Sequence, residues 1–218
     1  MSKKFYLDIE CDGLLGQTLI QIGCVSEDHE TFNGFVNPPY MRPLPLRCTN
    51  LTGFFNYKGR LFQNGIELDS SPRVEVLKRF REWLRTKALH SADKSLFYTN
   101  PLTLICPNGY GYDFRILSRH YSQCGLILNP TIRCCDSLSI IKKYYSTHPV
   151  QKPAGARGYS LDSLADYYKI TNSAAHNGLA DSITLKKVCD YFIFNHSLPL
   201  DHFTSPFREL STFQAKNA

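Results

Sequence analysis

Apolar and polar positions in the first part of this chain follow the patterns of β-strands. Runs rich in β-branched and aromatic residues span Lys3 to Ile9, Thr18 to Ser26 and Thr31 to Val36, and such residues favour strands. The connection Glu27 to Glu30 is short and polar, which predicts a hairpin between the second and third strands. The next segment, Asn37 to Ser70, is irregular and rich in proline, glycine and asparagine. We expect part of it to be functional or mobile, because structureless loops of this length are uncommon inside domains.

The second part of the chain alternates strand and helix patterns. Short apolar strands are predicted over Leu102 to Cys106 and Thr131 to Cys135. The spacing of apolar residues predicts helices that begin near Ser71, Phe114, Ser137, Ser160 and Gly178. Strands first, and then strand and helix in alternation, indicate one α/β domain with a mixed sheet. We therefore predict a single domain over residues 1–200 and a polar, loosely held C-terminal tail over residues 201–218.

Composition argues against secreted, disulfide-rich and membrane proteins. The 218 residues are 43% hydrophobic and 20% charged, as in soluble globular proteins. No signal peptide precedes the first strand, and no apolar run approaches the length of a membrane span. The eight cysteines form no CxxC pair, which predicts buried free thiols in a reducing compartment. We expect an intracellular, soluble protein of the cytoplasm or nucleus that makes no contact with membranes.

Two acidic residues interrupt the first apolar strand, in the stretch FYLDIECDGL. Side chains alternate between the two faces of a strand, so Asp8 and Glu10 share one face. Two carboxylates about 4 Å apart repel by roughly 1 kcal/mol in water, and by more as the dielectric falls. Acidic residues are also depleted in strands. This pair predicts a bound cation.

Two further acidic residues stand at predicted helix starts. Asp113 follows the strand LTLIC, and Asp181 lies in the first turn of the last helix. Taken singly, each is explained by the favourable interaction of an acid with the helix dipole. The net charge of +6 likewise permits binding to a polyanion without requiring it.

Taken together, these residues form three motifs in a fixed order. Asp8-Ile9-Glu10 is the first, Asn108-Gly109 with Tyr112-Asp113 is the second, and His176 with Asp181 is the third. They resemble the DEDD exonucleases, in the subgroup with a histidine (DEDDh). The stretches FYLDIECDGL, NGYGYDFRIL and ARGYSLDSLADYYKITNSAAHNGLADSITL resemble the three-prime repair exonuclease (TREX) group in particular. Three motifs in order and at correct spacing rarely match by chance.

The resemblance implies a fold and a metal site. The fold is RNase H-like, as in the DnaQ-like exonucleases: a mixed five-stranded sheet flanked by helices. The cofactors are two Mg²⁺ ions, for which Mn²⁺ substitutes. Asp8 is implied to bridge both ions, Glu10 and Asp181 to hold the ion that carries the attacking water, and Asp113 to support the other. His176 is implied to be the general base, a role that suits histidine near neutral pH.

Substrate-binding residues follow from the same resemblance. They are Cys11, Leu14, Asn108, Tyr112 and Arg157. Leu14 would wedge against the terminal base, Tyr112 would stack or bind phosphate, and Arg157 would meet the phosphate backbone. A buried leucine, a core tyrosine and an exposed arginine remain the alternatives. Pro107 stands where many relatives have histidine, and Asp12 replaces a small or hydroxyl residue.

The function implied is a metal-dependent 3′→5′ exodeoxyribonuclease that releases nucleoside 5′-monophosphates. Its substrate would be single-stranded DNA or the 3′ end of a duplex. The alternatives are a 3′→5′ exoribonuclease, since the catalytic motifs do not report the sugar, and a nucleic-acid-binding module without activity. TREX relatives are homodimers paired through edge strands, and Thr31 to Val36 is the candidate edge.

Overall fold

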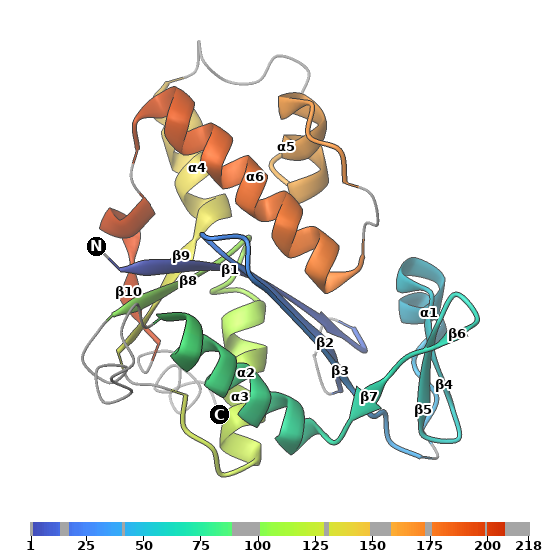
Figure 1. The fold of residues 1–218 in the computed structure, drawn as a ribbon. Coiled ribbons are helices and arrows are strands. Elements are labelled where there is room, and N and C mark those ends of the chain that lie inside the picture. The colour runs from blue at the N-terminus through green and yellow to red at the C-terminus, as the bar shows by residue number, and fades with distance from the viewer. Residues whose placement is uncertain are drawn as a thin grey trace, which may run out of the picture.

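A mixed sheet forms the centre of the protein (Figure 1). The computed structural model describes residues 2–13, 18–40, 42–88, 101–128, 131–148, 158–172, 176–198 and 200–207. Within them, the seven strands run in the order β10-β9-β8-β1-β2-β3-β7. The five longer strands are β1 (Lys3–Cys11), β2 (Leu19–Ser26), β3 (Thr31–Val36), β8 (Leu102–Cys106) and β9 (Ile132–Asp136). They are the predicted five-stranded sheet, to which β7 (Ser70–Ser71) and β10 (Ser205–Pro206) add one short strand at each edge.

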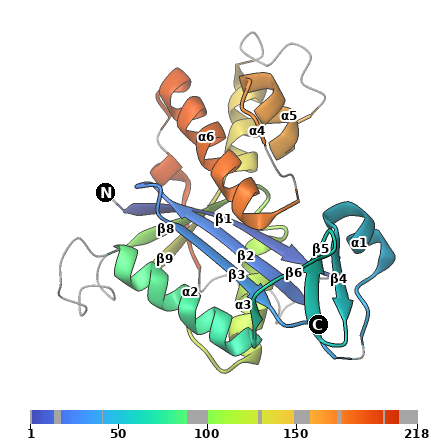
Figure 2. The same ribbon diagram turned by 45° about the vertical axis from the view of Figure 1, so that its right-hand side comes forward.

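Helices cover both faces of this sheet, as Figures 1 and 2 show. The helices α4 (Ser137–Thr147), α5 (Leu161–Tyr168) and α6 (Gly178–His196) lie on one face, and α2 (Arg73–Ala88) and α3 (Asp113–Gln123) lie on the other. Strand β1 pairs antiparallel with β2 and parallel with β8, so it is the central strand. The predicted α/β fold is confirmed.

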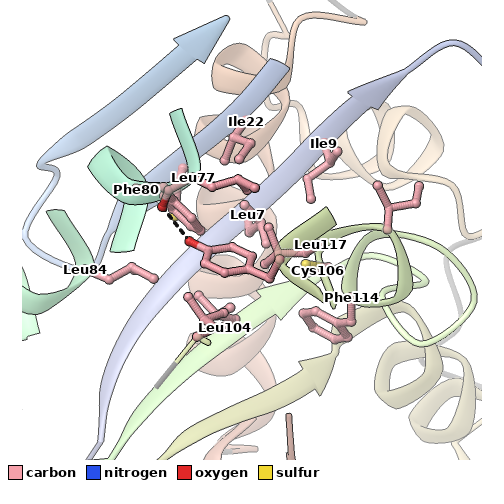
Figure 3. Close-up of a cluster of buried hydrophobic side chains, with 14 of the residues drawn as sticks. Leu7, Ile9, Ile22, Leu77, Phe80, Leu84, Leu104, Cys106, Phe114 and Leu117 are labelled. Atoms are coloured by element: carbon pink, nitrogen blue, oxygen red, sulfur yellow. Dashed lines mark hydrogen bonds between the residues drawn. The ribbon is translucent and has the colours of Figure 1, made fainter. Parts of the chain in front are cut away.

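Alternation along β1 builds two separate cores. Leu7 and Ile9 point toward α2 and α3 and pack with residues such as Phe80 and Leu117 (Figure 3). Side chains of this size each contribute about 1.5–3 kcal/mol when fully buried. Tyr6 points to the opposite face and packs with residues of α4, α5 and α6. Asp8 and Glu10 share that second face, because they are two and four residues beyond Tyr6.

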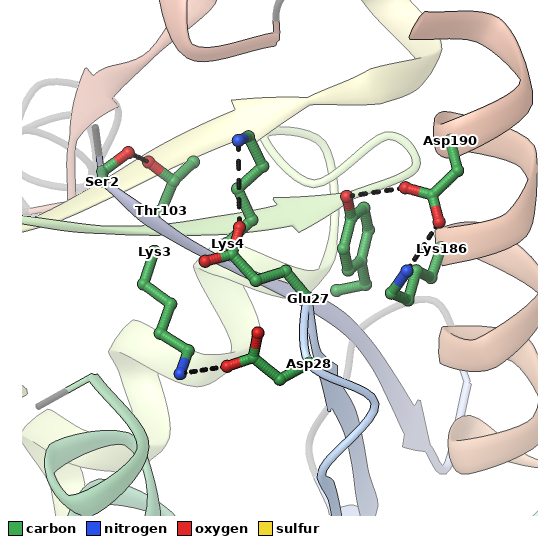
Figure 4. Close-up of polar contacts among 9 residues, drawn as sticks. Ser2, Lys3, Lys4, Glu27, Asp28, Thr103, Lys186 and Asp190 are labelled. Atoms are coloured by element: carbon green, nitrogen blue, oxygen red, sulfur yellow. Dashed lines mark hydrogen bonds and ion pairs between the residues drawn. The ribbon is translucent and has the colours of Figure 1, made fainter. Parts of the chain in front are cut away.

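Polar contacts fix the start of β1 and its position beside α6 (Figure 4). Lys3 is ion-paired with Asp28 of the β2–β3 turn, at 2.5 Å. On α6, Lys186 Nζ lies 2.6 Å from Asp190 Oδ2, and the Tyr6 hydroxyl donates to Asp190 Oδ1 at 3.4 Å. Helix α6 is thereby attached to the face of β1 that carries the two acids.

The segment expected to be irregular forms a helix and a small sheet instead. Helix α1 (Leu46–Thr52) precedes β4 (Phe54–Tyr57), β5 (Arg60–Gln63) and β6 (Ile66–Glu67). Two-residue turns, Lys58-Gly59 and Asn64-Gly65, join these strands, and all four turn residues have positive φ. Such turns match the twist of a hairpin. A small core of Ile20, Leu44, Cys48, Phe54 and Leu61 packs this unit against β2.

The end of the chain adds to the main sheet. The 3₁₀ helix η3 (Leu200–Phe203) is followed by β10, which pairs antiparallel with β9. Phe207 is buried and Ser205–Pro206 pair with β9, so this part of the predicted tail packs against the domain. Residues 208–218 lie outside the described residues. All eight cysteines are free, and seven of them are buried. No helix among the described residues is long and apolar enough to cross a membrane.

Candidate active site

Three carboxylates converge at the carboxyl end of β1. One oxygen from each of Asp8, Glu10 and Asp181 lies within 4.8 Å of the others. Asp8 and Glu10 come from the strand face that was predicted, and Asp181 comes from the first turn of α6. The fold thus brings together three of the acidic residues that the strand pattern and the motif order indicate.

Two glycines allow α6 to approach the sheet closely enough to form this cluster. Gly23 of β2 is the register partner of Asp8. A Cβ atom on Gly23 would lie 2.0 Å from the carbonyl carbon of Gly178, the first residue of α6. The Gly178 N–H also donates to the buried Oε1 of Gln21 at 2.9 Å. The start of α6 therefore rests directly on β2, and Asp181 reaches Asp8 and Glu10.

Asp113 lies beside this group of three. It is the first residue of α3 and is buried. Its Oδ1 accepts a hydrogen bond of 3.0 Å from the backbone N–H of Ile9, which stands between the two strand acids. The fourth predicted acid is thus attached to the same strand.

Burial is the main cause that raises the pKa values of all four acids, and neighbouring carboxylates add to it. Burial, and then the charges of Asp113, Glu10 and Asp181, raise the pKa of Asp8 well above its ordinary value. Burial and the Asp181 charge raise the pKa of Glu10 to about 7. Burial raises the pKa of Asp113 to about 7 against the effect of its backbone hydrogen bonds, and burial also raises the pKa of Asp181. Each shift reports a carboxylate that is costly to ionise without a nearby positive charge.

His176 is held next to Asp181 by its backbone. Its N–H donates to Asp181 Oδ2 at 2.8 Å. Its φ of 64° is in the left-handed region, which few residues other than glycine occupy. Asn177 follows as the N-cap of α6, accepting from Ala180 N–H. This turn is supported from the small sheet, because Asn177 Nδ2 donates to Gln63 Oε1 at 3.3 Å. The third motif is therefore folded as one connected unit.

A cavity of about 480 Å³ adjoins Glu10. Two predicted substrate-binding residues, Cys11 and Tyr112, line it together with Asp12. The Tyr112 hydroxyl donates to the backbone carbonyl of Gly13 at 3.0 Å. This volume lies within the range of small-molecule sites.

The other predicted substrate-binding residues fall in different places. Asn108 is at the turn after β8, with a φ of 56°, and its N–H donates to Asp136 Oδ1 at 3.0 Å. Leu14 and Arg157 lie outside the described residues.

Sequence reasoning missed two arginines of this cavity. Arg42 and Arg47 line it from the segment between β3 and α1 and from α1 itself. Arg42 is 3.7 Å from the carboxylate of Asp12, which also accepts from the Thr18 N–H. The stretch RPLPLR, which is basic and rich in proline, could have drawn attention to these arginines. Its position beside the cavity depends on the packing of α1 on the small core.

Comparison with known proteins identifies the family. The family model described as Exonuclease (RNase_T) matches residues 5–189. The chain therefore belongs to the exonuclease family, which agrees with its fold and its group of acids.

Individual relatives are similar over part of their length. Three prime repair exonuclease 2 of Homo sapiens is 34% identical over 87 residues, which are 39% of this chain and 37% of the human protein. The Mus musculus protein of the same name is 33% identical over 101 residues, which are 45% of this chain and 41% of the mouse protein. The matched part thus spans less than half of each curated relative.

Solved structures share the fold. A zinc-bound complex of E. coli ExoI with single-stranded DNA has a TM-score of 0.71 at 14% identity, over 93% of this chain and 42% of that chain. The nuclease domain of 3′hExo, a DEDDh family member bound to rAMP, has a TM-score of 0.58 at 16% identity, over 89% of this chain and 92% of that chain. The fold expected from the three motifs is confirmed.

Proposed function

We propose that this protein is a metal-dependent 3′→5′ exodeoxyribonuclease that releases nucleoside 5′-monophosphates. The observation that carries the proposal is the convergence of Asp8, Glu10 and Asp181 within 4.8 Å, with Asp113 bonded to the same strand and His176 bonded to Asp181. The family supplies the class of reaction.

The acids suit divalent metal ions. Carboxylate oxygens are the ligands that Mg²⁺ and Mn²⁺ prefer, and the raised pKa values of Glu10 and Asp113 mark a site that a cation would stabilise. We propose that Asp8, Glu10, Asp113 and Asp181 hold two Mg²⁺ ions, with Mn²⁺ as a substitute. Bound there, the ions would polarise the scissile phosphate and stabilise charge on the attacking and leaving oxygens.

The remaining steps belong to the protein's own side chains. The imidazole of His176 accepts a proton from the attacking water through a ring nitrogen. The backbone N–H of His176 donates to the Asp181 carboxylate. This bond holds the proposed base and a proposed metal ligand at a fixed distance within one turn. Attack by the water oxygen breaks the bond between phosphorus and the 3′ oxygen, and that oxygen, now the new 3′ hydroxyl of the shortened strand, takes up a proton from solvent. The nucleotide is released with the phosphate on its 5′ oxygen, and the His176 imidazolium returns its proton to solvent.

The terminal nucleotide would occupy the cavity beside Glu10. Tyr112 offers an aromatic face and Cys11 a small apolar surface, while Arg42 and Arg47 add positive charge for phosphates. Leu14, Asn108 and Arg157 remain proposed contacts from the family resemblance.

DNA is proposed as the substrate, either single-stranded or at duplex 3′ ends. The similarity to proteins named three prime repair exonuclease 2 and to an ExoI–single-stranded DNA complex supports it. RNA is the second candidate, since the similarity to 3′hExo bound to rAMP covers 92% of that chain.

Organisation of the chain is part of the proposal. We propose a single exonuclease domain over residues 1–200, followed by a tail over residues 201–218. We also propose a homodimer paired through β3. Among the described residues, β7 pairs with Phe35 and Val36 at the outer edge of β3, which leaves the first part of that edge open to a strand of a second copy. The eight free cysteines support a reducing compartment, such as the cytoplasm or nucleus.

The test is digestion of 5′-labelled oligonucleotides. Single-stranded DNA, RNA of the same sequence and a duplex would each be incubated with Mg²⁺ and, separately, with EDTA. We expect a Mg²⁺-dependent ladder that shortens DNA from the 3′ end. Asp181→Ala should abolish it, whereas Asp28→Ala, the same change in a surface ion pair, should not.

Each other outcome has a clear meaning. Cleavage of RNA equal to or faster than cleavage of DNA would establish the ribonuclease instead. Metal binding without cleavage of any substrate would indicate a binding module. Equal activity in Asp181→Ala and the wild type would refute the proposed site.

A further inference from the structure

Asn172 makes an unusual contact with one of the candidate metal ligands. It lies in the segment that joins α5 to α6, four residues before His176. Its Nδ2 donates to Asp181 Oδ1 at 2.8 Å and lies 3.4 Å from Asp162 Oδ1. Asp181 Oδ2 accepts from the His176 N–H at 2.8 Å. Each carboxylate oxygen of Asp181 therefore receives one N–H, which fixes the plane of the group and leaves lone pairs for a cation.

The acceptor end of the same amide has no partner. Among the described residues, Asn172 Oδ1 is a buried oxygen without a hydrogen bond. A buried polar atom left in this state opposes folding. The reverse orientation of the amide would point Oδ1 at the carboxylates of Asp162 and Asp181, so the N–H₂ end must face the acids.

A structural role does not explain this arrangement. An asparagine that closes a turn or caps a helix bonds to the backbone, whereas within the described part of the chain the Asn172 side chain donates to two carboxylates. An apolar residue of the same shape would fill the position without an unpaired oxygen. The feature unique to asparagine here is the hydrogen bond to Asp181.

We infer that Asn172 is a positioning residue that holds the Asp181 carboxylate in its metal-binding orientation. The inference rests on the proposed function. Groups that orient metal-bound carboxylates contribute about 10- to 100-fold to metal affinity or activity. The amide acts through Asp181 and needs no contact with the substrate.

The experiment measures Mn²⁺ binding to the metal-free protein by thermal shift. Asn172→Leu keeps the shape of the side chain and removes the amide. Asn172→Ala removes the same donor and is used if the leucine variant does not fold. Asn195→Ala is the matched control, because Asn195 is exposed on α6 and its Nδ2 donates to a backbone carbonyl, Tyr191 O, at 2.7 Å. Exonuclease kcat and KM for DNA are measured alongside.

We expect Asn172→Leu to raise the half-saturating Mn²⁺ concentration about 10- to 100-fold. Its Tm without metal should equal or exceed that of the wild type, because the unpaired oxygen is gone. Its kcat should fall at sub-saturating metal while KM for DNA stays unchanged. Asn195→Ala should change none of these values.

Two results would overturn the inference and leave the proposed function standing. Wild-type Mn²⁺ affinity in both Asn172 variants would show that Asp181 needs no such support. A fall in Tm without metal that accompanies the loss of affinity would assign Asn172 a structural role. If the wild type itself shows no Mn²⁺-dependent shift, the proposed function fails and this inference fails with it.

Discussion

We predict that a side chain at Gly23 would disturb the site, because Gly23 lies against the Gly178 backbone at the start of α6. In Gly23→Ala, the new methyl group would lie 2.0 Å from the Gly178 carbonyl carbon and 2.2 Å from the Leu179 nitrogen. Carbon atoms pack best at about 3.5–4.0 Å, so the start of α6 must move away from β2 by about 1.5 Å. The colliding atoms are backbone, which cannot turn aside as a flexible side chain can.

The displacement should separate the candidate metal ligands. Asp181 is in the first turn of α6 and moves with it, whereas Asp8 and Glu10 stay on β1. A misplacement of about 1 Å can cost about 10²-fold in rate, so kcat should fall by about that factor. Overpacking costs about 1–3 kcal/mol, which corresponds to a fall in Tm of about 2–12 °C in a domain of this size.

The assay compares Gly23→Ala with Gly158→Ala. Among the residues that the structure describes, the nearest atom to a new Cβ at Gly158 is Ser163 Oγ at 4.0 Å, so that variant should behave as the wild type. Exonuclease kcat, half-saturating Mn²⁺ and Tm are measured for both. Wild-type kcat and Mn²⁺ affinity in a folded Gly23→Ala would refute the argument that this contact places Asp181.

Two further predictions concern the raised pKa values. Burial and Asp181 raise the pKa of Glu10 from 4.5 to about 7, so its ionisation opposes folding as the pH rises from about 4 to 7. Without metal at pH 8, Glu10→Gln should therefore raise the free energy of unfolding by about 1–3 kcal/mol, and it should abolish Mn²⁺ binding. Denaturant unfolding in EDTA measures the change in stability, and a destabilised variant would contradict the prediction. Protons should also compete with the ion at Glu10 and Asp113, whose pKa values are both raised to about 7. Half-saturating Mn²⁺, measured by calorimetry, should rise as the pH falls from 8 to 6, and a constant value would count against the raised pKa values.

Local patterns in the sequence determined most of the elements and the candidate catalytic groups. Alternation in the first strand placed Asp8 and Glu10 on one face, and the face is the one that meets α6. Helix starts were readable because capping and apolar spacing act within a few residues. The order and spacing of the three motifs, which resemble those of a known family, then indicated Asp113, His176 and Asp181.

Contacts between distant segments were decided only by the tertiary structure. The approach of Gly23 to Gly178 joins residues of β2 and α6, and the bond from Asn177 to Gln63 joins α6 to the small sheet. The segment that holds Arg47 has an irregular pattern in the sequence, because its strands are short and pair as hairpins only against a small shared core. Periodicity reports which face of an element is buried, but not which other element buries it. That choice depends on packing across the whole chain, and it decides how close the acids come to one another.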